Sequence, residues 1–413
     1  MAHFVTKISD IIEFNPRESI ARRQVCKKVP MEYLQPFTRQ ISGFEEAPYA
    51  GGTKFRNNDT IMARITPCLE NGKTAFVKGF AENEVVFGST EYIVMRAIPG
   101  HSDPAFIYYL ATSPSFREVA IKSMVGSSGR QRVQQDVLEN LELILPDYET
   151  QVRVGKVLSA FDDKIELNTQ INHNLEEQAK AIFKSWFVDF EPFKNENLVD
   201  SAFGMVPSCF KVCKNGDLPI FVTDYVANGS FATLKANVTL YQESNYAYFI
   251  RNTDLKSGIF EVFVDKHSYN FLSKTKLFGG EVIISNVGDV GSVFLCPALE
   301  KPMTLGNNII MLKSENIALQ NYLYIWFKWF YGQNLIQGIK SGSAQPKFNK
   351  TDFKALSVLL PPSEKLHDFY EVIGPMFQEM EARNKESKRL AQLRDTLLPM
   401  LMSGEIDVSE VEI

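Results

Sequence analysis

The sequence contains two related halves, and this internal repeat is the feature that most limits how the chain can fold. Residues 132–146 align without a gap on residues 347–361, an offset of 215 residues that persists into the segments that follow. Four shorter pairs correspond upstream after small insertions, namely 4–6 with 221–223, 55–64 with 277–286, 87–90 with 305–308 and 127–131 with 342–346. Solenoid repeats are only about 20–50 residues long. The chain is therefore predicted to be one module used twice.

Each module is predicted to begin with a domain of mixed secondary structure. Runs of β-branched and other apolar residues predict strands at 60–65, 91–96, 141–145, 282–287 and 309–312. Residues 106–110 and 321–327 predict short buried helices, and glycines mark turns between the runs. The predicted fold class is therefore α+β, with two tandem α/β-mixed domains at 1–148 and 196–363.

A long helix is expected after each domain, at 149–195 and at 364–413. Apolar residues recur there in steps of three and four, which is the a/d pattern of a coiled coil. Both patterns become polar in the middle, at 168/172 and at 383/387. Polar residues at matching positions favour one register, so the helices should pair antiparallel as an intramolecular coiled coil whose polar layers meet. The residues expected to pack between the helices are Leu158, Phe161, Ile165, Asn168, Asn172, Leu175, Ile182, Ile373, Met380, Arg383, Ser387, Leu390 and Leu397.

Charge is distributed unevenly along the chain. The formal net charge is −5, yet residues 1–148 are neutral and residues 201–363 carry +4. The acidic excess lies in the helical segments, with −4 over 149–200 and −5 over 364–413. Because DNA binding depends on cations near phosphates, any DNA contact is expected from the two domains.

The sequence gives no sign of a membrane, secreted or metal-binding protein. No run approaches the ~20 apolar residues that cross a bilayer, and no secretory signal is visible at the N-terminus. The five cysteines are odd in number and form no CxxC or Cys/His cluster. We therefore expect a cytoplasmic protein with reduced thiols and no metal site.

Catalytic motifs are also missing from the sequence. It contains no phosphate-binding loop, no (Asn/Asp)-Pro-Pro-aromatic motif of a methyltransferase and no nucleophile elbow. Adjacent acidic pairs such as Asp162-Asp163 fit solvated helix faces, because sequence neighbours on a helix do not face each other. A nuclease of unrecognised type would need clustered carboxylates with a lysine in each domain, and no such set occurs twice. We therefore expect a non-catalytic chain.

Polar, glycine-rich loops remain as candidates for DNA binding. Arg and Lys pair well with guanine, Asn and Gln pair well with adenine, and all can contact phosphates or sugars. Taken singly each loop could be an ordinary surface turn, but the loops recur at corresponding places in both halves. The candidate DNA-binding residues are Lys54, Arg56, Asn57, Asn58, Arg64, Thr66, Lys73, Ser89, Thr90, Arg130, Gln131 and Arg132 in the first half, and Asn286, Asn307, Asn308, Lys340, Ser343, Gln345, Lys347 and Asn349 in the second.

A tandem repeat of a domain and a long helix, with these segments in this order, resembles the specificity subunit of type I restriction-modification systems. The resemblance rests on residues 55–73 and 88–94 in the first module and on 280–285 and 342–347 in the second. The Leu-Pro endings at 145–146 and 360–361 precede the helices as they do in that family. The individual motifs are loose, but their ordered arrangement is specific and covers essentially the whole chain.

The resemblance implies that each domain is a target-recognition domain that reads one half of a split, asymmetric sequence in double-stranded DNA. It also implies that the helices set the number of unread base pairs and dock two methyltransferase subunits, which restriction/translocase subunits join. S-adenosylmethionine, ATP and Mg²⁺ would then be bound by partner subunits, and no cofactor by this chain. The alternative is a non-catalytic coiled-coil scaffold that binds proteins instead of DNA. Salt-dependent binding of the complex to duplex DNA would separate the two.

Overall fold

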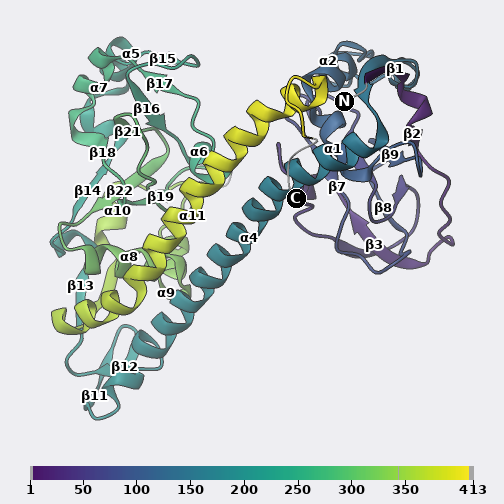
Figure 1. Cartoon of the computed structure of the whole chain (residues 1–413). Coiled ribbons are helices and arrows are strands. Elements are labelled where there is room, and N and C mark those ends of the chain that lie inside the picture. Colours follow the sequence, from purple (N-terminus) through teal and green to yellow (C-terminus); the bar gives the residue numbers. More distant parts are fainter. Residues whose placement is uncertain (1–2, 343, 409–413) are drawn as a thin grey trace. The chain divides into compact units, whose positions relative to one another are not determined.

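The computed structural model describes residues 3–342 and 344–408, and the chain divides into two compact units. Unit 1 combines the described parts of 1–170 and 383–413, and unit 2 is formed by 171–382. The fold is α+β, as predicted, with two domains of mixed content and two long helices (Figure 1). The division nevertheless differs from a simple order of domain, helix, domain, helix, because each long helix contributes one part to each unit.

Unit 1 is built on two four-stranded sheets, with strand orders β2-β9-β6-β7 and β4-β3-β8-β5, and on the separate antiparallel pair β1-β10. Strand β6 is buried along its whole length, which explains why apolar residues follow one another from Ile61 to Ala63 instead of alternating with polar ones. The strands are β1 His3–Lys7, β2 Ile12–Phe14, β3 Val25–Val29, β4 Glu45–Pro48, β5 Lys54–Phe55, β6 Thr60–Ala63, β7 Thr74–Phe76, β8 Val86–Gly88, β9 Tyr92–Ala97 and β10 Glu142–Pro146.

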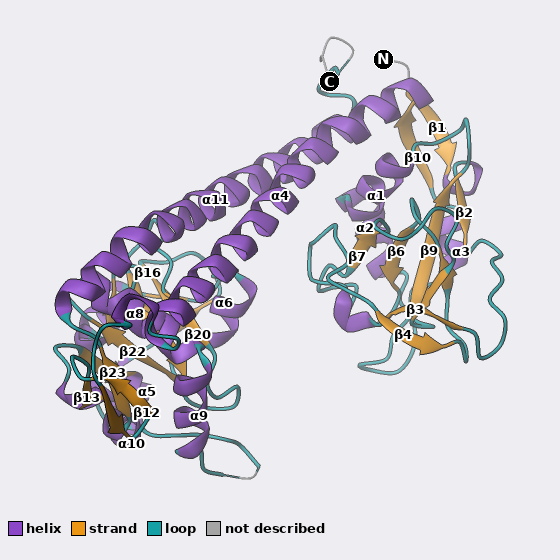
Figure 2. Ribbon diagram, turned by 90° about the horizontal axis from the view of Figure 1, so that it is seen from below, coloured by secondary structure: helices purple, strands orange, loops and turns teal. Residues whose placement is uncertain are grey.

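Helix α1, Pro104–Thr112, packs on strands β6, β7 and β9 of unit 1 (Figure 2). Asp103 caps its first turn by accepting a hydrogen bond from the Phe106 amide at 2.9 Å, and Pro104 occupies the first helical position. The helix is almost wholly buried and joins the core of the sheet to the long helices. Unit 1 also contains α2 Pro114–Lys122, α3 Gln135–Glu139, and the 3₁₀ turns η1 Ile8–Asp10 and η2 Met31–Tyr33.

Unit 2 repeats this plan with three additional strands among its described residues, one in the second sheet and two in a further pair. Its sheets have the orders β14-β22-β19-β20 and β15-β17-β16-β21-β18, with the separate pairs β13-β23 and β11-β12. Helix α8, Ile317–Lys328, takes the place of α1 and is likewise buried. The strands are β11 Leu198–Ser201, β12 Gly204–Pro207, β13 Lys211–Lys214, β14 Phe221–Asp224, β15 Leu240–Tyr241, β16 Ala247–Ile250, β17 Phe263–Val264, β18 Lys276–Leu277, β19 Val282–Ser285, β20 Val293–Leu295, β21 Met303–Leu305, β22 Ile309–Lys313 and β23 Ser357–Leu360. The remaining elements are α5 Phe231–Asn237, α6 Asn252–Ser257, α7 Lys266–Phe271, α9 Phe330–Gly338, α10 Lys350–Ala355, and the 3₁₀ turns η3 Glu191–Phe193, η4 Asn215–Asp217, η5 Tyr225–Asn228 and η6 Ser273–Thr275.

One part of the predicted repeat alignment is wrong. Phe4 in β1 lies opposite Leu145 in β10, and the equivalent pair in unit 2 is Lys211 in β13 opposite Leu360 in β23. Phe221 lies instead in β14, whose pairing with β22 corresponds to that of β2 with β9. Segment 4–6 therefore matches 211–213 rather than 221–223. Short apolar strands resemble one another in sequence, and only the pairing partner distinguishes them.

The two long helices are α4, Tyr148–Phe187, and α11, Ser363–Ser403, and they pair antiparallel within each unit. They end earlier than the predicted limits of 195 and 413. Phe190 adopts a left-handed backbone conformation (φ 56°) and Pro192 follows two residues later, so α4 does not continue. Gly404, with φ 76°, ends α11 in the way glycine commonly ends helices.

Candidate nucleic-acid interface

Three loops of unit 1 meet at one place, which we call junction 1. The first loop follows β6, the second precedes β9, and the third is the turn between Val125 and Arg132. The amide of Arg64 donates to the carbonyl of Glu91 at 2.9 Å, and the amide of Thr66 donates to the carbonyl of Gln131 at 3.0 Å. These backbone bonds join segments that are far apart in the sequence, and they hold three polar loops side by side.

Unit 2 contains the same arrangement, which we call junction 2. The amide of Asn286 donates to the carbonyl of Asn308 at 3.1 Å, and the amide of Gly288 donates to the carbonyl of Pro346 at 2.9 Å. A turn closed between Ser341 and Lys347 corresponds to the turn closed between Val125 and Arg132. Asn286 therefore corresponds to Arg64, Asn308 to Glu91 and Lys347 to Arg132. The predicted match of 87–90 with 305–308 is thus wrong by one residue at Asn308, which it equates with Thr90.

A glycine positions one loop of each junction. Strand β8 runs parallel to β3 and ends at Gly88, where a Cβ would lie 2.6 Å from the carbonyl oxygen of Val29. Strand β21 runs parallel to β16, and a Cβ on Gly306 would lie 2.5 Å from the carbonyl oxygen of Ile250. Such contacts are too close for any side chain, so both positions require glycine for the close approach of two backbones.

The two junctions carry different charges on equivalent backbone. In junction 1 the guanidinium of Arg132 donates to both carboxylate oxygens of Glu91, at 2.9 and 2.6 Å. These hydrogen bonds hold the pKa of Glu91 below its ordinary value, and burial opposes the effect. In junction 2 the corresponding pair is Lys347 with Asn308, so no carboxylate offsets the lysine at that position.

Each junction also contains a buried polar atom that the chain leaves without a hydrogen bond. Among the described residues, Nε of Arg64 and Oδ1 of Asn286 have no hydrogen-bond partner, and the two residues occupy equivalent positions. Their other polar groups donate to backbone carbonyls, Arg64 to Val133 at 3.2 Å and Asn286 to Phe348 at 3.2 Å. A buried polar atom without a partner costs free energy, and both junctions carry this cost at equivalent positions.

The long helices of unit 1 are joined by polar contacts at the positions where the sequence pattern becomes polar. Arg383 donates to Oδ1 of Asn168 at 3.1 Å, and Asn168 donates to Glu386 at 2.8 Å and to Ser387 at 3.2 Å. In unit 2, Asn172 donates to the carbonyl of Met380 at 3.4 Å. All thirteen residues expected to pack between the helices are buried or half-buried.

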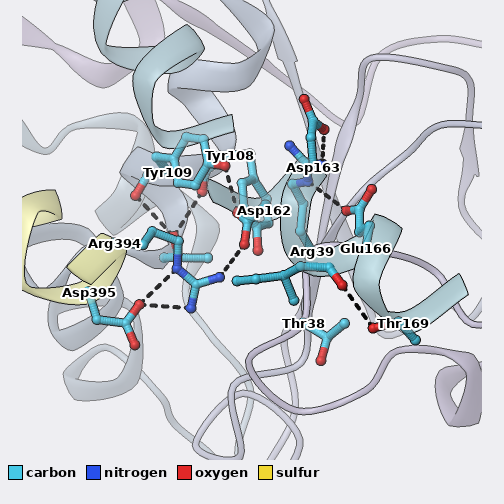
Figure 3. A network of polar contacts seen from close by, with 12 residues as sticks. Thr38, Arg39, Tyr108, Tyr109, Asp162, Asp163, Glu166, Thr169, Arg394 and Asp395 are labelled. Carbon is cyan, nitrogen blue, oxygen red and sulfur yellow. Dashed lines mark hydrogen bonds and ion pairs between the residues drawn. The ribbon is translucent and has the colours of Figure 1, made fainter. Parts of the chain in front are cut away.

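A second polar network ties the domain of unit 1 to its helices (Figure 3). Arg394 of α11 forms an ion pair with Asp162 of α4, and the hydroxyl of Tyr109 of α1 donates to Asp162 at 2.6 Å. Arg39, which is buried, pairs with Asp163 and donates to Glu166 at 2.8 Å. Burial lowers the pKa of Arg39, but the two carboxylates outweigh that effect and raise it overall. The guanidinium therefore stays charged.

Comparison with known protein families assigns both halves of the chain. The model of the family described as "Type I restriction modification DNA specificity domain" matches residues 5–177 and again residues 188–392. The chain belongs to this family. The two matches make each module a specificity domain, and the sequence-based identification of the family is confirmed.

Named relatives are similar over most of the chain. The MjaIX specificity subunit of a type I restriction enzyme from Methanocaldococcus jannaschii is 28% identical over 74% of this chain and 70% of its own length. The HindI specificity subunit from Haemophilus influenzae is 26% identical over 89% of this chain and 90% of its own length. The crystal structure of a type I restriction-modification S subunit from M. genitalium has the same fold, with a TM-score of 0.54, 17% identity, and coverage of 97% and 96%.

Several candidate residues of the first specificity domain belong to junction 1, and others have partners elsewhere in the chain. Arg64, Thr66, Ser89, Thr90, Arg130, Gln131 and Arg132 lie on its loops, with Thr90, Arg130 and Arg132 exposed. Lys54 and Lys73 donate instead to the carbonyls of Glu18 and Met31 at 3.0 and 2.9 Å. Arg56 pairs with Glu18 at 3.5 Å, Asn57 bonds the backbone of Phe80, and Asn58 is a turn residue with φ 72°. DNA contact by any of these residues stays a prediction.

The second specificity domain distributes its candidates similarly. Asn286, Asn307, Asn308, Gln345 and Lys347 lie on the loops of junction 2, and all but Asn286 are exposed. Lys340 is also exposed and lies beside the turn, whereas the side chain of Asn349 caps helix α10 by accepting from the Asp352 amide at 2.8 Å. Ser343 lies outside the described residues.

Sequence reasoning did not select a basic and aromatic surface on the second specificity domain. Lys266 lies over the ring of Tyr246 at 5.9 Å, and Lys276 lies over the ring of Tyr269 at 4.6 Å. The two tyrosine rings are 5.4 Å apart, so the four side chains form one cluster. The lysine-rich stretch 266–276 was the available sequence signal, but it has no visible counterpart in the first half.

Two features are absent from the part of the chain that the structure describes. In that part, no helix combines the length and apolar character needed to cross a membrane. Within the same residues, no group of three or more His, Cys, Asp or Glu side chains is arranged to hold a metal ion.

Proposed function

We propose that this chain is the DNA sequence-recognition subunit of a type I restriction-modification complex and that each junction reads one half of a bipartite, asymmetric target. The observation that carries the proposal is the repetition of one backbone arrangement with different side chains. Junction 1 presents Arg64, Glu91 and Arg132, whereas junction 2 presents Asn286, Asn308 and Lys347 at equivalent positions. Similar backbones with different donors and acceptors read different base sequences. Membership of the family favours this function over a scaffold that binds only proteins.

The proposal includes partners that supply the chemistry. Two methyltransferase subunits dock on the paired helices α4 and α11, and restriction/translocase subunits join that core. S-adenosylmethionine, ATP and Mg²⁺ are bound by those partners, and this chain has no catalytic role of its own. The complex works in the cytoplasm, where the DNA is. The relatives support this division of labour through their names as specificity subunits of restriction enzymes.

Methylation mapping tests the proposed function. The chain is co-expressed with its cognate methyltransferase subunits, and methylated adenines are mapped across the host genome. We expect a bipartite motif with an unread spacer. A single unsplit motif, or no methylation by an assembled complex, contradicts the proposal.

Substitutions in the junctions sharpen the test. Arg64→Ala is expected to relax recognition in one half-site, and Asn286→Ala in the other, by about 1–3 kcal/mol of discrimination each. The matched controls Arg389→Ala and Asn334→Ala change exposed residues on α11 and α9 and should leave the motif unchanged. If both junction variants relax the same half-site, the assignment of one junction to each half is wrong.

The long helices are proposed to set the spacer between the half-sites. Deleting residues 165–171 from α4 and the equivalent residues 380–386 from α11 removes one heptad from each helix. At ~1.5 Å per residue the paired helices become about 10 Å shorter. At ~3.4 Å per base pair, the mapped spacer should shorten by about three base pairs. An unchanged spacer in an active complex shows that the helices do not set it.

A further inference from the structure

Unit 1 contains an apolar groove that the described residues of the chain leave open. It has a volume of about 520 Å³ and lies where three elements meet. The lining comes from Ser113–Ser115 at the start of α2, from Glu142–Leu145 of β10, and from Pro399, Met402 and Ser403 near the end of α11. Leu143, Leu145, Pro399 and Met402 make most of this lining apolar.

The equivalent place in unit 2 is filled by the chain itself. The offset of 215 equates Met402 with Phe187, and aligning α2 on α9 from their first residues, Pro114 and Phe330, equates Ser115 with Tyr331. Phe210 packs edge-on against Phe187 with ring centroids 6.4 Å apart, and Phe203 packs edge-on against Tyr331 at 5.9 Å. Phe203 and Phe210 belong to the segment that connects α4 to β13, and Val206 between them is also buried. This segment thus inserts apolar side chains where unit 1 has its groove.

The equivalent strands β10 and β23 also differ in how far their side chains are exposed. Ile144 of β10 is 65% exposed, whereas its counterpart Leu359 of β23 is 2% exposed. The carbonyl of Leu359 also accepts a hydrogen bond from the hydroxyl of Tyr322 in α8. Aligning α1 on α8 from their last residues, Thr112 and Lys328, equates Tyr322 with Phe106, which has no hydroxyl. Strand β10 therefore presents an apolar side chain where β23 is covered, and β1 is its one neighbour among the described strands.

In unit 1, the described residues that follow α11 do not close the groove. Residues 404–408 do not line the groove. Instead, Ile406 and Val408 pack against the core formed by α1 and the first part of α4. Exposed apolar surface of this kind on a soluble protein marks an interaction site.

We propose that the groove of unit 1 binds an extended segment of another subunit of the restriction-modification complex, which carries two large apolar or aromatic side chains about seven residues apart. The segment Phe203–Phe210 shows the chemistry of the occupant, because it has that spacing and fills the equivalent place in unit 2. The segment lies along β10 and buries Ile144. The identity of the occupant as a complex subunit rests on the proposed function.

Photo-crosslinking in the assembled complex tests the proposal directly. A benzophenone amino acid replaces Ser115, which is exposed, in the full-length chain co-expressed with its cognate methyltransferase and restriction subunits. Irradiation is expected to join this chain to another subunit, at a peptide that contains two large apolar residues with the stated spacing. The same probe at the exposed Ser19 in unit 1 is the control and should not label that peptide. If the probe at position 115 labels only this chain, or nothing, the proposal is overturned.

A charge placed on the groove provides the second measurement. Ile144→Asp changes an exposed side chain, so the fold is retained, and it should weaken binding of the partner subunits at least about tenfold. Val25→Asp is the matched control, because Val25 is 64% exposed on strand β3 of the same unit. Equal affinities of the two variants for the purified partner subunits contradict the groove proposal. If the affinities are equal but a bipartite motif is still mapped, only the groove proposal is contradicted. If an assembled wild-type complex gives no bipartite motif, the proposed function itself is contradicted.

Discussion

At one pair of equivalent positions, the two units join a domain to the long helices by different kinds of contact. In unit 1, Asp162 of α4 forms a buried ion pair with Arg394 of α11. At the offset of 215 the corresponding positions of unit 2 are Phe377 on α11 and Ala179 on α4. There the ring of Phe377 packs edge-on against Tyr324 of α8 with centroids 5.6 Å apart. One repeated scaffold thus accommodates either charges or rings at the same positions.

The ion pair and the aromatic contact contribute to stability in different ways. Two charges removed from water recover in mutual attraction about what their desolvation costs, so a buried ion pair adds little net stability but is costly to break. Packed aromatic rings add apolar burial and a modest specific attraction, and they tolerate change more gradually. Unit 1 should therefore respond sharply to loss of one partner, and unit 2 less sharply.

The largest effect is expected from Arg394→Ala, which leaves Asp162 buried without its cation. We expect the free energy of opening of unit 1 to fall by about 3 kcal/mol. Hydrogen exchange of α1 and of residues 148–170, followed by mass spectrometry on the whole chain, measures this quantity. The control Arg389→Ala removes an exposed arginine from the same helix and should have little effect. Equal effects of the two substitutions would show that the ion pair is not important.

A smaller effect is expected from Phe377→Ala in unit 2. Phe377 is half-buried, so loss of its ring contact and of part of its apolar burial should cost about 2 kcal/mol. The loss should appear in the exchange of α8 and of residues 171–187, with unit 1 unchanged. A greater loss than in Arg394→Ala would reverse the comparison.

The double substitution Asp162→Phe/Arg394→Ala copies the side chains of unit 2 into unit 1. Removing both charges together avoids the penalty of a lone buried carboxylate, so opening should stay within about 1 kcal/mol of the wild type. The hydroxyl of Tyr109 loses its acceptor, which accounts for the remaining loss. If exchange in the double variant is as fast as in Arg394→Ala, the two solutions are not interchangeable.

The smallest effect concerns acid and the Lys328–Glu176 pair of unit 2. Burial raises the pKa of Glu176, but Lys328 and Lys180 outweigh it, so its pKa lies below the ordinary 4.5. A carboxyl of this kind stabilises the fold above its unfolded pKa, and the contribution is lost as pH falls through the folded pKa. Below about pH 4.5, the free energy of unfolding of unit 2 should therefore fall by a small amount, less than about 1 kcal/mol. The Glu176→Gln variant should not show this loss. The exposed Glu149→Gln should behave as wild type, and an identical acid response of Glu176→Gln would contradict this role.

Much of the fold could be predicted because it depends on local pattern. The coiled-coil pattern placed Leu158 and Ile373 between the helices, since a periodicity of three and four is a property of neighbouring residues. The helix ends were missed because they depend on the backbone of Phe190 and Gly404. The pairing of β1 was also missed, since insertions change the offset upstream and short strands look alike.

The candidate site was predictable in position but not in detail. Both halves repeat the loops, so the loops could be chosen as candidates without knowing how they meet. Asn57 and Lys73 instead bond backbone atoms of Phe80 and Met31, which are distant in the sequence. Sequence reasoning about a polar loop cannot tell a side chain that supports the chain from one that is available to a ligand.

The division of the long helices between the units has a consequence for synthesis on the ribosome. Unit 2 is one continuous stretch, 171–382, and can complete its contacts as soon as that stretch has emerged. Unit 1 begins first but needs Leu398, Leu401 and Met402 of α11 for its core. Chains grow at about 5–20 residues per second, so unit 1 waits tens of seconds for its last helix. Unit 1, whose translation begins first, is thus the last unit to complete its fold.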